Sequence, residues 1–148
     1  MYTLTFVAGL LSSPALAQST TYDLQPESSR LSVLVKYDRS ALVAGHDHIV
    51  QPSTFDGTVT WDPADPGACR VSIGFPVTAL QVDPPGARAQ ARLEGETSDG
   101  DKRKIKANLE GKYQLQASLF PRIAFESTRC EAAGDGFRVS GPLTLHGV

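Results

Sequence analysis

The chain has 148 residues, the length of a single domain. Hydrophobic residues make up 41% of it and charged residues 20%, which excludes a disordered or fibrous protein. The formal net charge is -2, and no run of Lys or Arg is long enough to follow a phosphate backbone, so a nucleic-acid-binding protein is not expected.

The first seventeen residues have the pattern of an export signal. An uncharged stretch, LTFVAGLL, precedes Ala15-Leu16-Ala17, a small-x-small cleavage site, and is shorter than the roughly 20 residues of a membrane-spanning helix. No basic residue precedes the stretch, so the signal is atypical or the true start lies upstream, and a short buried strand or helix is the alternative. We expect a signal peptide at 1–17, a domain at 18–148 in the periplasm or outside the cell, and no transmembrane segment after cleavage.

Alternation of apolar and polar residues dominates the chain from Arg30 onward. Such a period of two predicts half-buried β-strands. The alternating segments are 31–37, 55–61, 71–77, 123–127 and 137–145. Segments rich in Pro, Asp and Gly, such as DPADPG at 62–67 and AAGDG at 132–136, separate them as turns. The sequence therefore predicts a mainly β, antiparallel fold.

A helical insertion is expected between Asp83 and Gly111, where the alternation stops. Ser98 and Asp101 have the spacing of an N-terminal cap, Ile105 and Leu109 share one helix face, and Gly111 is placed to end the helix. The helix also carries a basic cluster, formed by Lys102, Arg103, Lys104 and Lys106. The cluster is either a site for an anionic head group or a solvated helix face, and we favour the second because charged surfaces are common.

Two cysteines, Cys69 and Cys130, suit one disulfide in a small exported domain. Their strand parities disagree, because Cys69 shares the inward register of Val71 whereas Cys130 shares the outward register of Glu126. A bond between them needs a bulge or a frayed strand end. A disulfide and two separate, partly buried thiols both remain open.

The C-terminal segment FPRIAFESTRCEAAGDGFRVSGPLTLHGV, at 120–148, resembles the signature of the YceI-like family. In that signature a Pro introduces a strand reading roughly "ItFkSt", and a Gly-Asp-Gly turn leads to a strand ending "LTlhGv". YDLQPESSRLSVLVKY, FDGTVTWDPADP and SDGDKRKIKANLEGKYQLQASLFP are similar to its opening strands, its next strand and turn, and its mouth-covering helix. Two features differ. Family members continue past the last motif with further strands, and GHDHIVQPSTF, at 45–55, indicates a variant branch.

The resemblance implies a lipocalin-like antiparallel β-barrel with the helical insertion over one mouth, and leaves open whether the barrel is complete at its C-terminal end. It also implies an isoprenoid-like tail, polyprenyl or quinone, held inside the barrel. A barrel of about eight strands has room for one such ligand. The expected inward-facing, ligand-binding residues are Val33, Val35, Tyr37, Phe55, Val59, Trp61, Val71, Ile73, Phe75, Phe125, Val139 and Leu143. The same residues could instead fill the barrel as an ordinary core.

His46 and His48, in the sequence GHDH, are the strongest candidates for a metal site. Histidines two apart on a strand point to the same face, and a third ligand such as His146 would complete a divalent metal site. A hydrogen-bonded polar pair without metal is the more common arrangement. For His146 we expect a hydrogen bond at a strand end.

No catalytic residue is predicted, since no serine-nucleophile elbow, metalloprotease motif or convergent pair of carboxylates is present. The preferred hypothesis is a non-enzymatic binding or carrier protein for an isoprenoid-like lipid. The alternative is a metal- or haem-associated redox accessory using His46 and His48. A third reading is a structural module with a filled barrel. Oligomeric state is left open, a dimer included.

Overall fold

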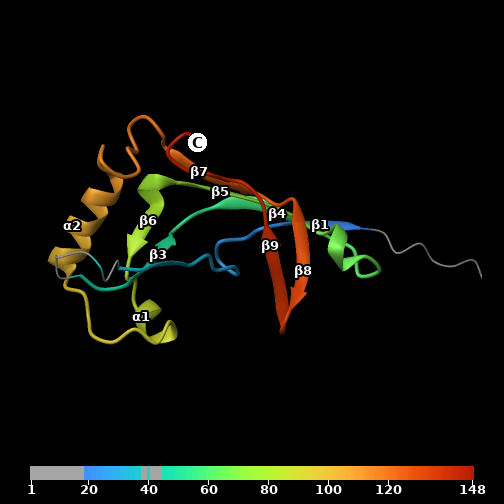
Figure 1. Ribbon diagram of the computed structural model, residues 1–148, viewed down its shortest axis with the longest axis horizontal. Coiled ribbons are helices and arrows are strands. Elements are labelled where there is room, and N and C mark those ends of the chain that lie inside the picture. Colours follow the sequence, from blue (N-terminus) through green and yellow to red (C-terminus); the bar gives the residue numbers. More distant parts are fainter. Residues whose placement is uncertain (1–18, 38–39, 41–44) are drawn as a thin grey trace, which may run out of the picture.

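The computed structural model describes residues 19–37, 40 and 45–148 (Figure 1). The expected signal peptide at 1–17 lies outside these residues and stays a prediction. The mainly β, antiparallel fold is confirmed. Within the described residues, no helix is both long enough and apolar enough to cross a membrane.

The largest sheet has five antiparallel strands, and we call it the main sheet. In spatial order they are β1 (Thr20–Asp23), β4 (Asp56–Trp61), β5 (Arg70–Pro76), β7 (Arg122–Glu126) and β10 (Leu143–Thr144). Its register places Val59 opposite Val71, and Ile73 opposite Phe125. Cross-strand partners point to the same side of a sheet, so these alternating apolar residues share one face, as the period of two predicts.

A second sheet of three strands, the small sheet, packs its apolar face toward the main sheet. In spatial order its strands are β2 (Val33–Val35), β3 (His48–Pro52) and β6 (Leu80–Val82). The chain passes between the two sheets four times, from β1 to β2, from β3 to β4, from β5 to β6 through the 3₁₀ turn Val77–Ala79, and from β6 to β7. Val50, Phe75 and Ile123 meet between the sheets in the core. A core shared by two sheets holds them face to face.

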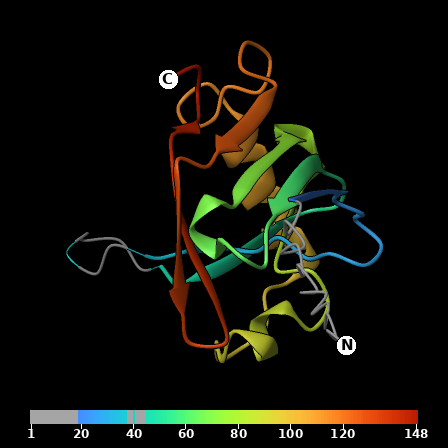
Figure 2. The ribbon, with the colours of Figure 1, turned by 90° about the vertical axis from the view of Figure 1, so that its right-hand side faces the viewer.

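The remaining strands form a hairpin, β8 (Arg129–Ala133) and β9 (Gly136–Ser140). Figures 1 and 2 show this hairpin running across one end of the molecule, at the opposite end from the long helix. The sequence predicts that residues 137–145 continue as one strand. Instead the chain divides at Gly141-Pro142, and β9 and β10 belong to different sheets. Proline lacks the N–H that a continuous ladder requires, which explains the division.

The same break explains the disulfide between Cys69 and Cys130, whose Cα atoms are 5.8 Å apart. The facing strand divides at Ser127-Thr128, so Cys130 lies in β8 rather than in the strand of Glu126. The parity conflict holds only for a continuous strand. Cys69 follows the short 3₁₀ helix Pro66–Ala68 and directly precedes β5. The bond therefore ties the hairpin to the main sheet.

Two helices form the insertion expected between Asp83 and Gly111: α1 (Ala87–Gln90) and α2 (Asp99–Glu110). The predicted cap of α2 is confirmed, since the Ser98 hydroxyl accepts a hydrogen bond from the backbone N–H of Asp101 at 3.1 Å. Gly111 ends the helix, as predicted. The helix lies against β6, at one end of the two sheets (Figure 1).

The described strands do not close into one barrel. Instead, the small sheet and the main sheet face each other, and no backbone pairing joins the edge strand β2 of one to the edge strand β10 of the other. Val33 and Val35 of β2 are 43% and 40% exposed. An apolar face is thus open along β2.

Candidate functional site

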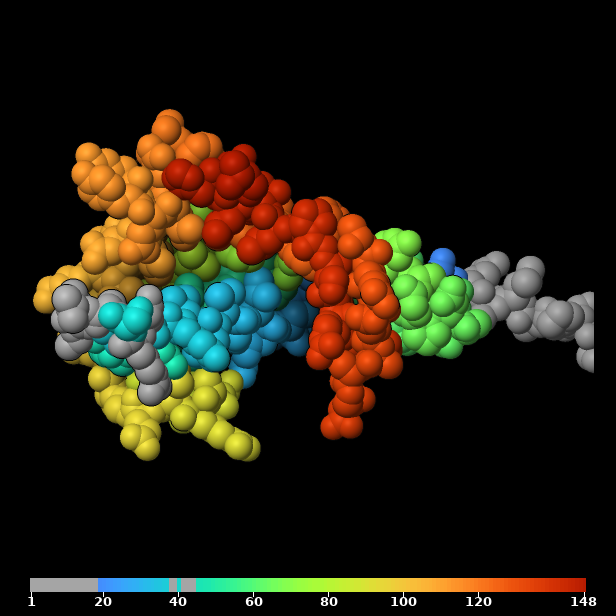
Figure 3. Space-filling view, in the orientation of Figure 1, coloured from blue at the N-terminus to red at the C-terminus, as the bar shows by residue number. Residues whose placement is uncertain are grey.

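An apolar cavity of about 240 Å³ lies between the two sheets. Every side chain in its lining is a hydrocarbon. The lining residues are Val33, Val35, Val50, Phe75, Leu80, Leu109, Leu115, Ile123, Leu143 and Leu145. Figure 3 shows this side of the molecule, where green atoms from the middle of the chain are visible between blue β2 and the red C-terminal segment. A cavity without polar groups offers water no hydrogen bonds, so it suits an apolar ligand.

Strand register places the lining residues together. Val33 pairs with Val50 across β2 and β3, and Phe75 pairs with Ile123 across β5 and β7. These two pairs face each other from opposite sheets, and Leu109 of α2 covers the end of the space between them. The helix therefore covers the cavity, which agrees with the expected position of the insertion.

Four of the twelve predicted ligand-binding residues line this cavity: Val33, Val35, Phe75 and Leu143. The other eight lie elsewhere. Ile73 packs against the core from the shared face of the main sheet, and Phe55 is buried within the core. Val59, Val71 and Phe125 lie on the shared face but outside the lining. Trp61 packs edge-on to Phe137 at 4.8 Å, Val139 pairs with Cys130 in the hairpin, and Tyr37 lies in a neighbouring hollow.

Six lining residues were not among the predicted ones: Val50, Leu80, Leu109, Leu115, Ile123 and Leu145. Three of them carry a usable signal in the sequence. Ile123 alternates with Phe125, Leu145 alternates with Leu143, and Leu109 shares the apolar helix face of Ile105. Leu115 lies in the turns after α2, where no periodicity reveals which side chain points inward.

A second hollow of about 510 Å³, which we call the histidine mouth, adjoins the apolar cavity. Val35 lines both spaces. The lining of the histidine mouth combines polar and apolar side chains. They come from β2, β3, the chain next to these two strands, and α2: Val35, Lys36, Tyr37, Gly45, His46, His48, Asp101, Lys104 and Ile105. The GHDH spacing groups the two histidines, but nothing in the sequence places Asp101 and Lys104 with them, because only tertiary packing brings α2 to the same hollow.

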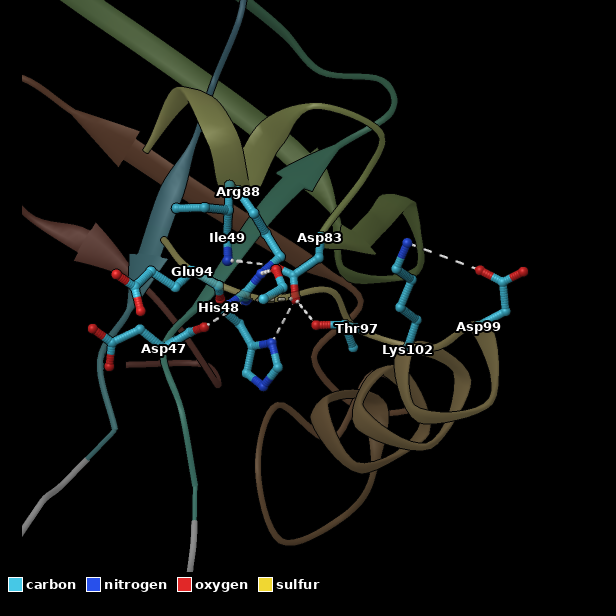
Figure 4. A network of polar contacts seen from close by, with 10 residues as sticks. Asp47, His48, Ile49, Asp83, Arg88, Glu94, Thr97, Asp99 and Lys102 are labelled. Atoms are coloured by element: carbon cyan, nitrogen blue, oxygen red, sulfur yellow. Dashed lines mark hydrogen bonds and ion pairs between the residues drawn. The ribbon is translucent and has the colours of Figure 1, made fainter. Parts of the chain in front are cut away.

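Behind the histidine mouth, Asp83 is the centre of a buried polar network (Figure 4). Only 2% of Asp83 is exposed. Its carboxylate accepts hydrogen bonds from His48 Nδ1 at 2.7 Å, Thr97 Oγ1 at 2.6 Å and the Ile49 backbone N–H at 2.8 Å. Burial raises the pKa of Asp83, but the hydrogen bonds from Thr97, His48 and Ile49 outweigh it and lower the pKa to about 2. Asp83 is therefore ionised at neutral pH.

Arg88 neutralises this buried carboxylate and joins the surrounding loops to it. Its guanidinium lies 3.2 Å from Asp83 Oδ2 and donates to the backbone carbonyls of Asp47, Glu94 and Gly95. Arg88 is itself 8% exposed. A buried ion pair is tolerated when each partner is also hydrogen-bonded, as here. The network holds the start of β3 and the loop before α2 in one position.

The two candidate metal ligands are close together, with the ring centroids of His46 and His48 4.4 Å apart. His146 does not lie in a strand, because it follows β10 in a turn with φ +54° and packs on Phe120 at 4.5 Å. Within the described residues, no group of three or more His, Cys, Asp or Glu side chains has a metal-binding arrangement. The predicted third ligand does not join the pair in that part of the chain.

The basic cluster on α2 is largely paired within the helix. Lys104 lies 3.3 Å from Asp101, and Lys106 lies 2.9 Å from Glu110. Lys106 also donates to the backbone carbonyls of Thr78 and Leu80. These contacts favour the solvated helix face over a patch for anions.

An antiparallel β-fold with a hydrocarbon-lined cavity under a helix is an architecture in which small apolar molecules are commonly bound. The chain belongs to the YceI-like family, because the model of the YceI-like domain matches residues 22–148. This is a family of binding proteins and not a known class of enzymes.

The chain is also similar to curated proteins of two Yersinia species. One is a UPF0312 protein of Yersinia pestis (strain Pestoides F), and another is a UPF0312 protein of Yersinia pseudotuberculosis serotype O:1b (strain IP 31758). Each is 32% identical over 94 residues, which covers 64% of this chain. The chain spans about 40% of the length of these relatives.

Proposed function

We propose that the protein is a periplasmic or secreted, non-enzymatic binding or carrier protein for an isoprenoid-like lipid of polyprenyl or quinone type. The observation that carries the proposal is the cavity of about 240 Å³ with an entirely hydrocarbon lining. Membership of the YceI-like family supports the same class of ligand. The disulfide supports an oxidising compartment, where such bonds persist.

The size of the cavity limits how much of a tail it holds. A cavity of about 150 Å³ admits benzene, so a volume of about 240 Å³ has room for a branched chain of about ten carbons. Burying ten carbons gains on the order of 8 kcal/mol, and association costs about 4 kcal/mol or more. The tail alone thus supports weak binding, and tighter binding requires contacts outside the apolar cavity.

Substitution on the two faces of β2 tests the proposal. Val33→Phe should fill the cavity and weaken binding of farnesol, a 15-carbon isoprenoid alcohol, at least tenfold. The matched control is Leu34→Phe, since Leu34 is similarly exposed but points to the opposite face of the same strand. Displacement of a fluorescent hydrophobic dye measures the affinities. Equal loss in both variants, or no binding by the wild type, would contradict the proposal.

Lipid extraction from the purified protein, followed by mass spectrometry, would identify the natural ligand. An extract without lipid, together with stoichiometric bound metal, would favour the redox accessory instead.

Sequencing of the exported protein from its N-terminus tests the location, and we expect the mature protein to begin at Gln18.

A further inference from the structure

We infer that the histidine mouth is the head-group subsite of this protein, and that it takes an uncharged, oxygen-bearing head group bound by His48 Nε2. The inference rests on the proposed function, because it concerns the polar end of the ligand whose tail fills the apolar cavity. Neither the family match nor the similarity to the Yersinia proteins assigns a role to these residues.

Three elements lead continuously from the apolar cavity into the histidine mouth. On β2, Val35 lines both spaces. On β3, Val50 lines the cavity and His48, two residues earlier on the same face, lines the mouth. On α2, Leu109 lines the cavity and Ile105, one turn earlier, lines the mouth. A ligand with its tail in the cavity therefore has its polar end beside His48.

His48 is held so that one nitrogen remains for a ligand. An ionised carboxylate only accepts hydrogen bonds, so Nδ1 must donate to Asp83 at 2.7 Å. Asp83 is in turn held by Thr97 and the backbone of Ile49 (Figure 4). The imidazole therefore has a set orientation, and Nε2 is the nitrogen left for the mouth. His46 places a second imidazole beside it, at a centroid distance of 4.4 Å.

The charges of the mouth favour an uncharged head group over a phosphate. Lys104 is paired with Asp101, whose carboxylate also lines the mouth. No arginine belongs to the described lining. The first turn of α2 is occupied by its Ser98 cap and by acidic side chains, so its N–H groups are not offered to an anion. A diphosphate would face the Asp101 carboxylate, and Lys36 is the one lysine of the described lining outside the ion pair of Asp101 and Lys104. A hydroxyl or carbonyl oxygen needs only one hydrogen bond.

Three probes with the same 15-carbon skeleton separate the tail from the head group: farnesene, farnesol and farnesyl diphosphate. We expect the wild-type protein to bind farnesol about five- to tenfold more tightly than farnesene, the contribution of one hydrogen bond, and to bind the diphosphate no more tightly than farnesol. In His48→Phe the ratio of the farnesol and farnesene affinities should fall to about one. The control Leu109→Ala removes part of the contact with the tail. It should therefore weaken the binding of all three probes and leave the ratio of the farnesol and farnesene affinities unchanged.

The outcomes distinguish the inference from the proposed function. If no probe binds, the proposed function fails. If all three bind the wild type equally, or if the diphosphate binds most tightly, the head-group inference is wrong while the binding function stands. Should His48→Phe not fold, NMR of the wild type gives the answer. The imidazole signals of His48 should shift on addition of farnesol and not of farnesene, and unchanged signals would overturn the inference.

Discussion

At the scale of single residues, Asp83 determines the geometry on which the histidine mouth depends. It combines a positive φ of +43° with near-complete burial and contacts to three separate segments. Aspartate and asparagine tolerate this left-handed backbone better than most residues, and only aspartate also neutralises Arg88. The sequence around it, Asp83-Pro84-Pro85-Gly86, predicted only a break in the strand pattern.

Replacement of Asp83 by asparagine should destabilise the fold by about 3 kcal/mol, because it leaves Arg88 buried without a counter-charge. Asparagine keeps the shape and tolerates the positive φ, and it removes the charge together with one of the two acceptor oxygens. The measurement is urea unfolding at pH 7. Asp99→Asn is the control, since the Asp99 side chain is 86% exposed, and it should change the free energy of unfolding by less than about 0.5 kcal/mol.

The same carboxylate predicts a loss of stability in acid. The pKa of Asp83 is about 2 in the folded protein against an ordinary value of 3.8. A folded-state pKa below the unfolded one stabilises the protein above about pH 4, and this stabilisation is lost as the pH falls toward 2. The contribution is about 2 kcal/mol. Unfolding free energies measured between pH 5 and pH 2 should fall more steeply in the wild type than in Asp83→Asn, and parallel curves would contradict the assignment.

At the scale of elements, the long C-terminal hairpin shows where strand patterns mislead. Alternation runs through 137–145, yet the paired strands divide together at Ser127-Thr128 and Gly141-Pro142. Hydrogen bonds bridge the break, from Ser127 N–H to the Val71 carbonyl and from Thr128 N–H to the Ser140 carbonyl, both at 2.8 Å. The backbone thus stays satisfied while the hairpin leaves the main sheet.

Gly141 permits this break, because a Cβ there would overlap the backbone carbonyl of Glu126. Gly141→Ala should therefore force the backbone apart and cost about 1–3 kcal/mol. Gly136, at the start of β9, has no atom close to the position of an added Cβ. Gly136→Ala should be nearly neutral in the same thermal unfolding assay. A neutral Gly141→Ala would show that the close approach is not essential.

At the scale of the whole molecule, two sheets, a helix and a hairpin are joined by a small core and one disulfide. The bond between Cys69 and Cys130 encloses a segment with a sequence separation of 61. This segment contains half of the residues that line the apolar cavity and the α2 residues that line the histidine mouth. The described strands β8 and β9 form a sheet of their own, so the disulfide is a covalent link that holds the hairpin on the main sheet.

Reduction of the disulfide should lower the free energy of unfolding by about 4 kcal/mol, the value for a closed loop of this length. Urea unfolding with and without dithiothreitol measures the difference. The double variant Cys69→Ala/Cys130→Ala serves as control, because it should show the lower stability under both conditions. If the reductant had no effect on the wild type, the bond would not be a stabilising element.

The cap of α2 and the sequence pattern of the family are local features, and they could be read directly from the chain. Period-two alternation likewise identified most strands, because the side of a strand is set by backbone geometry alone. Val33, Val35, Phe75 and Leu143 were recognised as inward-facing for this reason, and they do line the apolar cavity.

The amino-acid sequence by itself determined the antiparallel β class, the helical insertion and the family, since each depends on residues near one another in the chain. The tertiary structure alone decided which of the apolar residues enclose a cavity, that Cys130 reaches Cys69, and that Asp83 orients His48. Those facts depend on where strands stop and which sheets face each other, and segments far apart in the chain must first be packed together before any of them is defined.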